Sequence, residues 1–159
     1  MTALDLERPE PARVAEFSSV DDLLADARRR LVRVSPHQAA RRVRDGALLV
    51  DIRPQWQREA DGVVPGALHV ERNHLEWRLH PGSGASLPQA SWDAEWIVLC
   101  TEGYTSSLAA AALVSLGLDA TDVVGGIHAW RDAGLPTCRV AAAEIPIADV
   151  SGAVKTVVP

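Results

Sequence analysis

The side chain best suited to chemistry in this chain is the thiol of Cys100, which directly follows the apolar run Trp96-Ile97-Val98-Leu99. The apolar run predicts a buried strand, and the alanine-rich segment that begins at Leu108 predicts a helix. The loop between them places the thiol at a helix N-terminus, where backbone N–H groups can stabilise a thiolate or a bound anion. Cys100 is therefore a candidate nucleophile.

Three further segments accompany the cysteine loop in a fixed order along the chain. They are Asp51-Ile52-Arg53, Gly62-Val63-Val64-Pro65-Gly66-Ala67 and, after the cysteine, Val124-Gly125-Gly126-Ile127-His128-Ala129-Trp130. With these motifs, the stretch from Val32 to Pro136 resembles the rhodanese-like (sulfurtransferase) domain family. The resemblance implies a three-layer α/β fold in which helices flank a central, mainly parallel sheet.

The resemblance also divides the chain into three parts. We expect an N-terminal extension with one short helix over residues 1–31, a rhodanese-like domain over 32–137 and a C-terminal extension over 138–159. A chain of 159 residues with 47% hydrophobic content can bury one substantial core. Proline and charged residues predict a mobile lead up to about Ser19. Residues 137–159 fit either a trailing strand or a tail docked on a partner.

Helical and extended patterns alternate along the chain, which is typical of an α/β fold. The expected helices cover residues 20–31, 36–45, 74–79 and about 105–116, with a further helix after Gly126. Ser19 and Ser35 are candidate N-caps of the first two. The expected strands cover residues 31–34, 47–52, 68–70, 96–99 and 122–124. The continuous apolar run at 47–52 is typical of a parallel strand that is covered on both faces.

In active members of the family the loop reads Cys, two variable residues, Gly, one variable residue, Arg, and then Ser or Thr. The same register here contains Cys100, Thr101, Glu102, Gly103, Tyr104, Thr105 and Ser106. The loop length matches, but Thr105 stands in place of the arginine. By resemblance, Cys100 accepts a sulfane sulfur from a donor and holds it as a persulfide for transfer. Oriented loop amides would stabilise the sulfur anion without a side-chain base.

The charges of this loop bear on the sulfur donor. Thr105 removes a cation and Glu102 adds an anion, and both changes oppose the binding of an anionic donor such as thiosulfate. The expected partner is therefore a small sulfur donor or a protein that carries a persulfide. Arg53 and Arg72 are candidate substrate-binding cations, because each follows a predicted strand at the edge where α/β sheets bind ligands. For Arg53 we favour the alternative, a structural pair with Asp51 or another acid.

Composition excludes several other functions. The formal net charge of −5 argues against nucleic-acid binding, and the basic clusters 28–33 and 41–44 are expected to be solvated helix faces. No apolar run is long enough for a membrane span, and the N-terminus lacks a signal core, so a cytoplasmic protein is expected. The histidines lack metal-ligand spacing, and neither a metal nor a cofactor is expected.

Two alternatives to a sulfurtransferase remain open at this level. The first is a rhodanese-like binding or regulatory module in which the altered loop recognises a partner. The second is a relative of arsenate reductases or phosphatases, against which the missing loop arginine weighs most, because oxyanion chemistry needs a bidentate cation. Cys138, the second of two cysteines, is interpreted as a passive thiol. The sequence does not indicate the oligomeric state.

Overall fold

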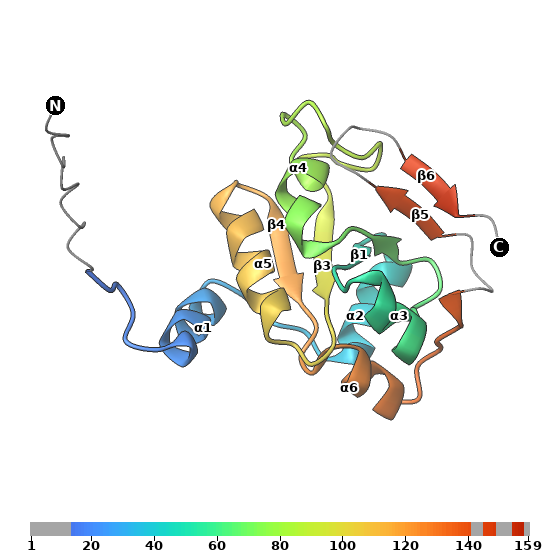
Figure 1. Cartoon of the computed structure of the whole chain (residues 1–159), viewed down its shortest axis with the longest axis horizontal. Helices are drawn as coiled ribbons and strands as arrows, with labels where there is room; N and C mark the ends of the chain where they lie inside the picture. Colours follow the sequence, from blue (N-terminus) through green and yellow to red (C-terminus); the bar gives the residue numbers. More distant parts are fainter. Residues whose placement is uncertain (1–13, 141–144, 149–153, 158–159) are drawn as a thin grey trace, which may run out of the picture.

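A computed structural model describes residues 14–140, 145–148 and 154–157 of the chain. Its centre is a six-stranded sheet in the order β4-β3-β1-β2-β5-β6 (Figure 1). The strands are β1 (Leu48–Asp51), β2 (Leu68–His69), β3 (Glu95–Leu99), β4 (Asp119–Asp122), β5 (Ile145–Ala148) and β6 (Val154–Val157). All neighbours pair in parallel except β5 and β6, which pair antiparallel. The structure thus confirms the α/β fold with a mainly parallel sheet.

Helices cover the sheet and supply two hydrophobic clusters. They are α1 (Val20–Arg29), α2 (Pro36–Arg44), α3 (Gln55–Asp61), the short 3₁₀ turn η1 (Arg72–His74), α4 (Leu75–Leu79), α5 (Thr105–Ser115) and α6 (Gly126–Asp132). Val98 of β3 packs into the cluster formed with α4 and α5, whereas Ile97 packs into the cluster formed with α2 and α6. Successive strand residues therefore face opposite layers, which produces the expected three-layer arrangement.

Strand register brings the site to one edge of the sheet. Asp51 at the end of β1 lies opposite Leu99 at the end of β3, and Val98 lies opposite Asp122 at the end of β4. The segments that follow these three strands therefore start side by side. This edge is where open α/β sheets bind their ligands.

Both predicted serine caps are confirmed. Ser19 Oγ accepts a hydrogen bond from the Asp22 amide, at 3.0 Å. Ser35 and Gln38 form a reciprocal capping box, with Pro36 in the first helical position. These contacts satisfy N–H groups that a helix start leaves without partners, so α1 and α2 begin where the sequence predicts.

Several elements differ from their predicted form. The strand expected at 31–34 is reduced to one bridge between Val34 and Val123. The strand expected at 122–124 is β4, which begins three residues earlier, at Asp119, and overlaps the expected range only at Asp122. A hydrophobic pattern does not predict this strand, because several of its residues are polar. These residues can be buried because tertiary hydrogen bonds satisfy their side chains. Helix α3 was not predicted, since its sequence is polar and has no apolar period.

The two ends of the chain extend beyond the region of family resemblance. Of the two predictions for the C-terminus, the structure has the strand: β5 joins the sheet beside β2 and continues into the β5–β6 hairpin. The predicted mobile lead falls mostly on residues 1–13, which lie outside the described residues. The domain boundaries at residues 31 and 137 remain predictions. Among the described helices, none combines the length and hydropathy that a membrane crossing requires.

Candidate active site

Cys100 lies immediately after β3 and is almost completely buried, with 3% of its surface exposed. The amide of Gly103 donates a hydrogen bond to its sulfur, with a nitrogen-to-sulfur distance of 3.2 Å. Helix α5 then begins at Thr105. The predicted strand, loop and helix are confirmed. The sequence predicts that several loop amides, from Thr101 to Ser106, stabilise the sulfur, whereas in this fully described loop Gly103 alone donates to it, because the other amides are directed elsewhere.

Glycines make this compact loop possible. Gly103 has φ +85°, and a Cβ there would lie 2.7 Å from the Gly125 nitrogen. Gly126 has φ +60°, and a Cβ there would lie 2.4 Å from the Thr101 carbonyl oxygen. Both positions therefore need glycine for its backbone conformation and for its lack of a side chain.

The start of α6 holds the cysteine loop from one side. The Ile127 amide donates to the Cys100 carbonyl at 2.8 Å, and the His128 amide donates to the Thr101 carbonyl at 3.2 Å. Trp130 is buried in the same hydrophobic cluster as Val123 and Ile127, and its indole N–H donates to the Pro136 carbonyl. The Gly125-Gly126 segment thus has the structural role that the sequence predicts for it.

A buried carboxylate anchors the first turn of α5. Asp122 is fully buried at the end of β4, and its Oδ2 accepts hydrogen bonds from the hydroxyls of Ser106 and Ser107, both at 2.8 Å. Arg33 forms an ion pair with the same carboxylate, with Nε 2.8 Å from Oδ1. A buried carboxylate is tolerated only with such partners. The helix that follows Cys100 is therefore tied to β4.

Two arginines from the N-terminal segment bind the backbone of the cysteine loop. The Gly103 carbonyl accepts hydrogen bonds from Arg28 Nη2 and Arg33 Nη2, each at 2.9 Å. The expectation that these two arginines belong to solvated helix faces is wrong, whereas Arg29 and Arg30 are indeed exposed and face Asp26. No local pattern separates Arg28 from its neighbours, because its role depends on α1 packing against α5.

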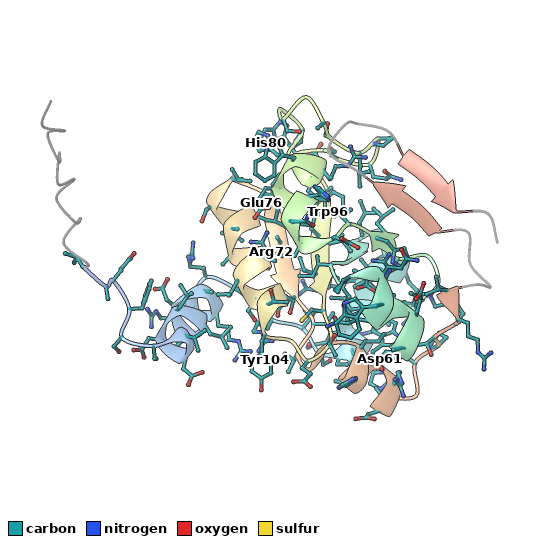
Figure 2. All side chains as sticks on the ribbon, in the orientation of Figure 1. Asp61, Arg72, Glu76, His80, Trp96 and Tyr104 are labelled. Carbon is teal, nitrogen blue, oxygen red and sulfur yellow. The ribbon has the colours of Figure 1, made fainter. Side chains whose placement is uncertain are left out.

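The outer rim of the loop carries acidic groups. Glu102, Tyr104 and Thr105 are exposed, and Glu102 Oε1 lies 3.9 Å from His128 Nδ1. The other ring nitrogen of His128 lies 3.7 Å from an oxygen of Asp61. Figure 2 shows Tyr104 and Asp61 at the same end of the molecule. Asp61 is also paired with Arg131, whose Nη1 lies 3.4 Å from its Oδ1. An incoming anion therefore meets Glu102 in a loop that has no lysine or arginine of its own.

A comparison with protein families identifies this arrangement. Residues 35–133, more than half of the chain, match the model of the rhodanese-like domain. The chain belongs to the rhodanese-like domain family.

Named relatives agree with this membership. The thiosulfate sulfurtransferase GlpE of Pseudomonas putida strain GB-1 is 38% identical over 101 residues, which are 62% of this chain and 84% of the relative. The corresponding GlpE of Pseudomonas entomophila is 34% identical over 100 residues, with the same coverage.

Solved structures extend the likeness beyond the family match. A Rhodopseudomonas palustris protein of unknown function, described as a possible tyrosine phosphatase, superposes with a TM-score of 0.71 at 28% identity, over 80% of this chain and all of its own. The polysulfide-sulfur transferase homodimer of Wolinella succinogenes shares the fold, with a TM-score of 0.61 at 23% identity, over 74% of this chain and 85% of its own.

Within this rhodanese-like site, Arg53 forms the predicted pair with Asp51. Its side chain has no exposed surface, Nη2 lies 2.6 Å from Asp51 Oδ2, and the same nitrogen donates to the Gly62 carbonyl at 2.7 Å. A substrate contact requires an accessible guanidinium, and that of Arg53 is enclosed. The structure therefore favours the structural role of Arg53 over its role as a substrate-binding residue.

The second candidate cation, Arg72, begins η1, and its amide donates to the Ile52 carbonyl just beyond β1. Its guanidinium lies 2.7 Å from Glu76 Oε1, and 38% of the side chain is exposed. Figure 2 labels both members of this pair, on η1 and α4. Because Glu76 neutralises the charge, Arg72 reaches an anion only by leaving this partner. Its substrate-binding role stays a prediction.

Other polar groups support the loop or lie buried near Asp51. Thr101 Oγ1 donates to Gln57 Oε1 of the unpredicted helix α3, at 2.9 Å. Arg58 donates to the Arg53 carbonyl at 2.6 Å, and burial lowers the pKa of its guanidinium. Burial also lowers the pKa of His69 to about 4, so this imidazole is neutral near neutral pH.

The second cysteine lies in a different backbone setting. Cys138 is half-buried, and its backbone exchanges two hydrogen bonds with Val63, both at 2.8 Å. Val63 is itself buried. Both cysteines are free thiols in the structure. The passive role of Cys138 stays a prediction.

Proposed function

We propose that this protein is a single-domain sulfurtransferase that carries sulfane sulfur as a persulfide on Cys100. The observation that carries the proposal is the hydrogen bond from the Gly103 amide to the buried Cys100 sulfur. A preorganised N–H donor stabilises sulfur anions, both the attacking thiolate and the persulfide that it becomes. The family membership and the names of the GlpE relatives support the same activity.

Transfer takes place in two balanced steps. The Cys100 thiolate attacks the outer sulfur of a donor R–S–SH, the donor's S–S bond breaks, and RS⁻ leaves with the bonding electron pair. A second thiolate, R′S⁻, then attacks the outer sulfur of the Cys100 persulfide. The products are R′–S–SH and the original Cys100 thiolate, so the cycle needs no external oxidant or cofactor. The loop contributes orientation and anion stabilisation.

The donor that fits this site best is a persulfide, either small or carried by a protein. Thiosulfate is a dianion, whereas the loop has Thr105 in place of arginine and exposes Glu102. A carboxylate at the rim opposes the approach of anions. A persulfide presents less charge at the reacting sulfur and depends less on a loop cation.

Two other functions also use a cysteine loop or a rhodanese-like fold. A phosphatase or arsenate reductase needs a cation in the loop that grips an oxyanion in two places. Here the guanidiniums of Arg28 and Arg33 donate to the Gly103 carbonyl, so neither is free to bind an oxyanion. This arrangement argues against a phosphatase or arsenate reductase. A binding or regulatory module is favoured by the exposed loop residues Glu102, Tyr104 and Thr105, and it would leave Cys100 chemically inert.

Mass spectrometry after treatment with sulfur donors distinguishes the enzyme from the binding module. The purified chain is incubated with thiosulfate and, separately, with glutathione persulfide, and then digested to locate added sulfur. We expect an added sulfur atom on Cys100 with the persulfide donor and much less with thiosulfate. If neither donor, at concentrations that load a GlpE control, modifies Cys100, the chain is the binding module.

A further inference from the structure

Helix α1 lies outside the family-matched residues 35–133, yet it contacts α5 and reaches the cysteine loop (Figure 1). We propose that Arg28 of α1 is a positioning residue for Cys100, which acts by holding Gly103 in the conformation that directs its amide at the sulfur. The consequence for sulfur transfer rests on the proposed function, whereas the consequence for thiol reactivity does not.

Three contacts connect Arg28 to the loop. Its Nη2 donates to the Gly103 carbonyl at 2.9 Å, and its Nε donates to Ser107 Oγ at 3.1 Å. Its guanidinium carbon also lies 5.8 Å from the ring centre of Tyr104, within the range of a cation–π contact. One planar side chain thus spans the loop and the first turn of α5.

Gly103 links this arginine to the sulfur. Its amide donates to Cys100 Sγ, and its carbonyl accepts from Arg28 and Arg33 and, at 3.3 Å, from the Ser107 hydroxyl. Glycine can adopt φ +85° at little steric cost, but its broad conformational range does not hold it there. The contacts to the carbonyl restrict that range, so they also restrict the direction of the amide.

Arg28 and Arg33 differ in what else they support. Arg33 is the ion-pair partner of the buried Asp122, so its loss leaves a buried carboxylate short of a cation and weakens the whole fold. Arg28 has no such partner among its described contacts. After its removal, Asp122 keeps Arg33 and the two serine hydroxyls. Arg28 can therefore be removed with little effect beyond the loop.

The matched control lies next to Arg28 on the same helix. Arg29 pairs with Asp26 on the surface, and 70% of its side chain is exposed. We compare Arg28→Ala, Arg28→Lys and Arg29→Ala in full-length Cys138→Ser protein, in which Cys100 is the sole thiol. The probe is iodoacetamide, a neutral reagent whose alkylation rate reports thiol reactivity without any sulfur transfer.

We expect Arg28→Ala to lower the alkylation rate about tenfold at pH 7.5 and to speed hydrogen exchange of the Gly103 amide by a similar factor, since a charge-assisted hydrogen bond is lost. The alkylation rate of Arg28→Lys should lie between those of the parent and Arg28→Ala, because lysine keeps the charge but lacks the planar guanidinium. Arg29→Ala should match the parent. Urea unfolding should give similar midpoints for all variants, which excludes a general loss of stability.

Equal alkylation rates and equal Gly103 exchange in Arg28→Ala and Arg29→Ala would overturn the proposal. Persulfide loading is then measured on the same proteins, and we expect it to fall in parallel with alkylation. A third outcome is that Arg28→Ala lowers the alkylation rate relative to the parent, but the parent itself takes up no sulfur. The positioning role of Arg28 then holds, and the sulfurtransferase proposal fails. The two failures are thus distinguishable.

Discussion

At the sulfur of Cys100, a stabilising amide and an unfavourable charge pattern act together. The Gly103 amide donates to the sulfur. The exposed Glu102 adds negative charge to the loop, and the neutral Thr105 does not balance it. The amide favours a sulfur anion at this position, whereas the negative charge of Glu102 disfavours a bound anion. The chemistry of Cys100 and its donor preference can therefore be tested separately.

The first test concerns the nucleophile. Cys100→Ser replaces the thiol with a hydroxyl that stays protonated near neutral pH, so it should abolish persulfide formation while the fold persists. Cys138→Ser serves as the matched control and should retain loading. Mass spectrometry after treatment with glutathione persulfide reports the result. Transferable sulfur on Cys100→Ser, or its loss in Cys138→Ser, would show that Cys100 is not the sole carrier.

The second test concerns the missing cation. Thr105→Arg should raise kcat/KM for thiosulfate about tenfold to a hundredfold, because one charge-assisted contact in the transition state contributes about 1.5 to 3 kcal/mol. Thr105→Gln adds a polar side chain without charge and should leave the rate close to that of the parent. A folded Thr105→Arg protein with no gain on thiosulfate would mean that this position does not limit anion use.

At the scale of elements, the turn between β4 and α6 packs against the cysteine loop. The amides of Ile127 and His128 donate to carbonyls of the loop, and this close approach depends on Gly126 having no side chain. The loop geometry is thus a joint property of β3, α5 and α6. Substitutions in the glycine turn should affect Cys100 without touching it.

The prediction at this scale compares two glycines in the left-handed region. At Gly134, with φ +73°, an added Cβ meets nothing within 4 Å, so Gly134→Ala should cost about 1 kcal/mol of unfolding free energy for conformation alone. At Gly126 the same change also clashes with the Thr101 carbonyl, so Gly126→Ala should cost about 3 kcal/mol or more. Urea unfolding measures both, and equal losses would contradict the close packing of the turn.

At the scale of the whole molecule, a buried histidine couples stability to pH. His69 faces Asp51 across β1 and β2, and burial lowers its pKa in the folded protein to about 4, below the ordinary value of 6.5. Between pH 6.5 and pH 4 the His69 imidazole binds a proton in the unfolded chain but stays neutral in the folded protein. The folded state therefore loses stability as pH falls from about 6.5 to about 4, by up to about 3 kcal/mol.

Urea unfolding at pH 7.5 and pH 4.5 tests this coupling. His69→Asn removes the titrating group, so its unfolding free energy should fall less between the two pH values than that of the parent. His37→Asn, a change at an exposed histidine, should leave the parent's pH dependence in place. The same pH dependence in all three proteins would assign the acid sensitivity to other groups.

Much of the framework could be predicted because it depends on neighbours in sequence. The apolar run before Cys100 requires a buried strand, Ser19 and Ser35 satisfy the N–H groups of the residues that follow them, and Asp51 lies within reach of Arg53 two residues on. Backbone preference, capping and short-range pairing decide such features. The position of the thiol and the length of its loop belong to this group.

Other features were decided only by the tertiary structure. The Gly103 carbonyl meets Arg28 because α1 packs on α5, and it meets Arg33 because the next residue, Val34, bridges Val123. Asp122 meets two serines because β4 lies beside β3. Helix α3 and its Gln57 contact to the loop likewise have no local signature. These partners are far apart in the chain, and their distances depend on how whole layers pack. A local sequence pattern does not determine that packing, so the contacts around Cys100 could be identified only in the folded structure.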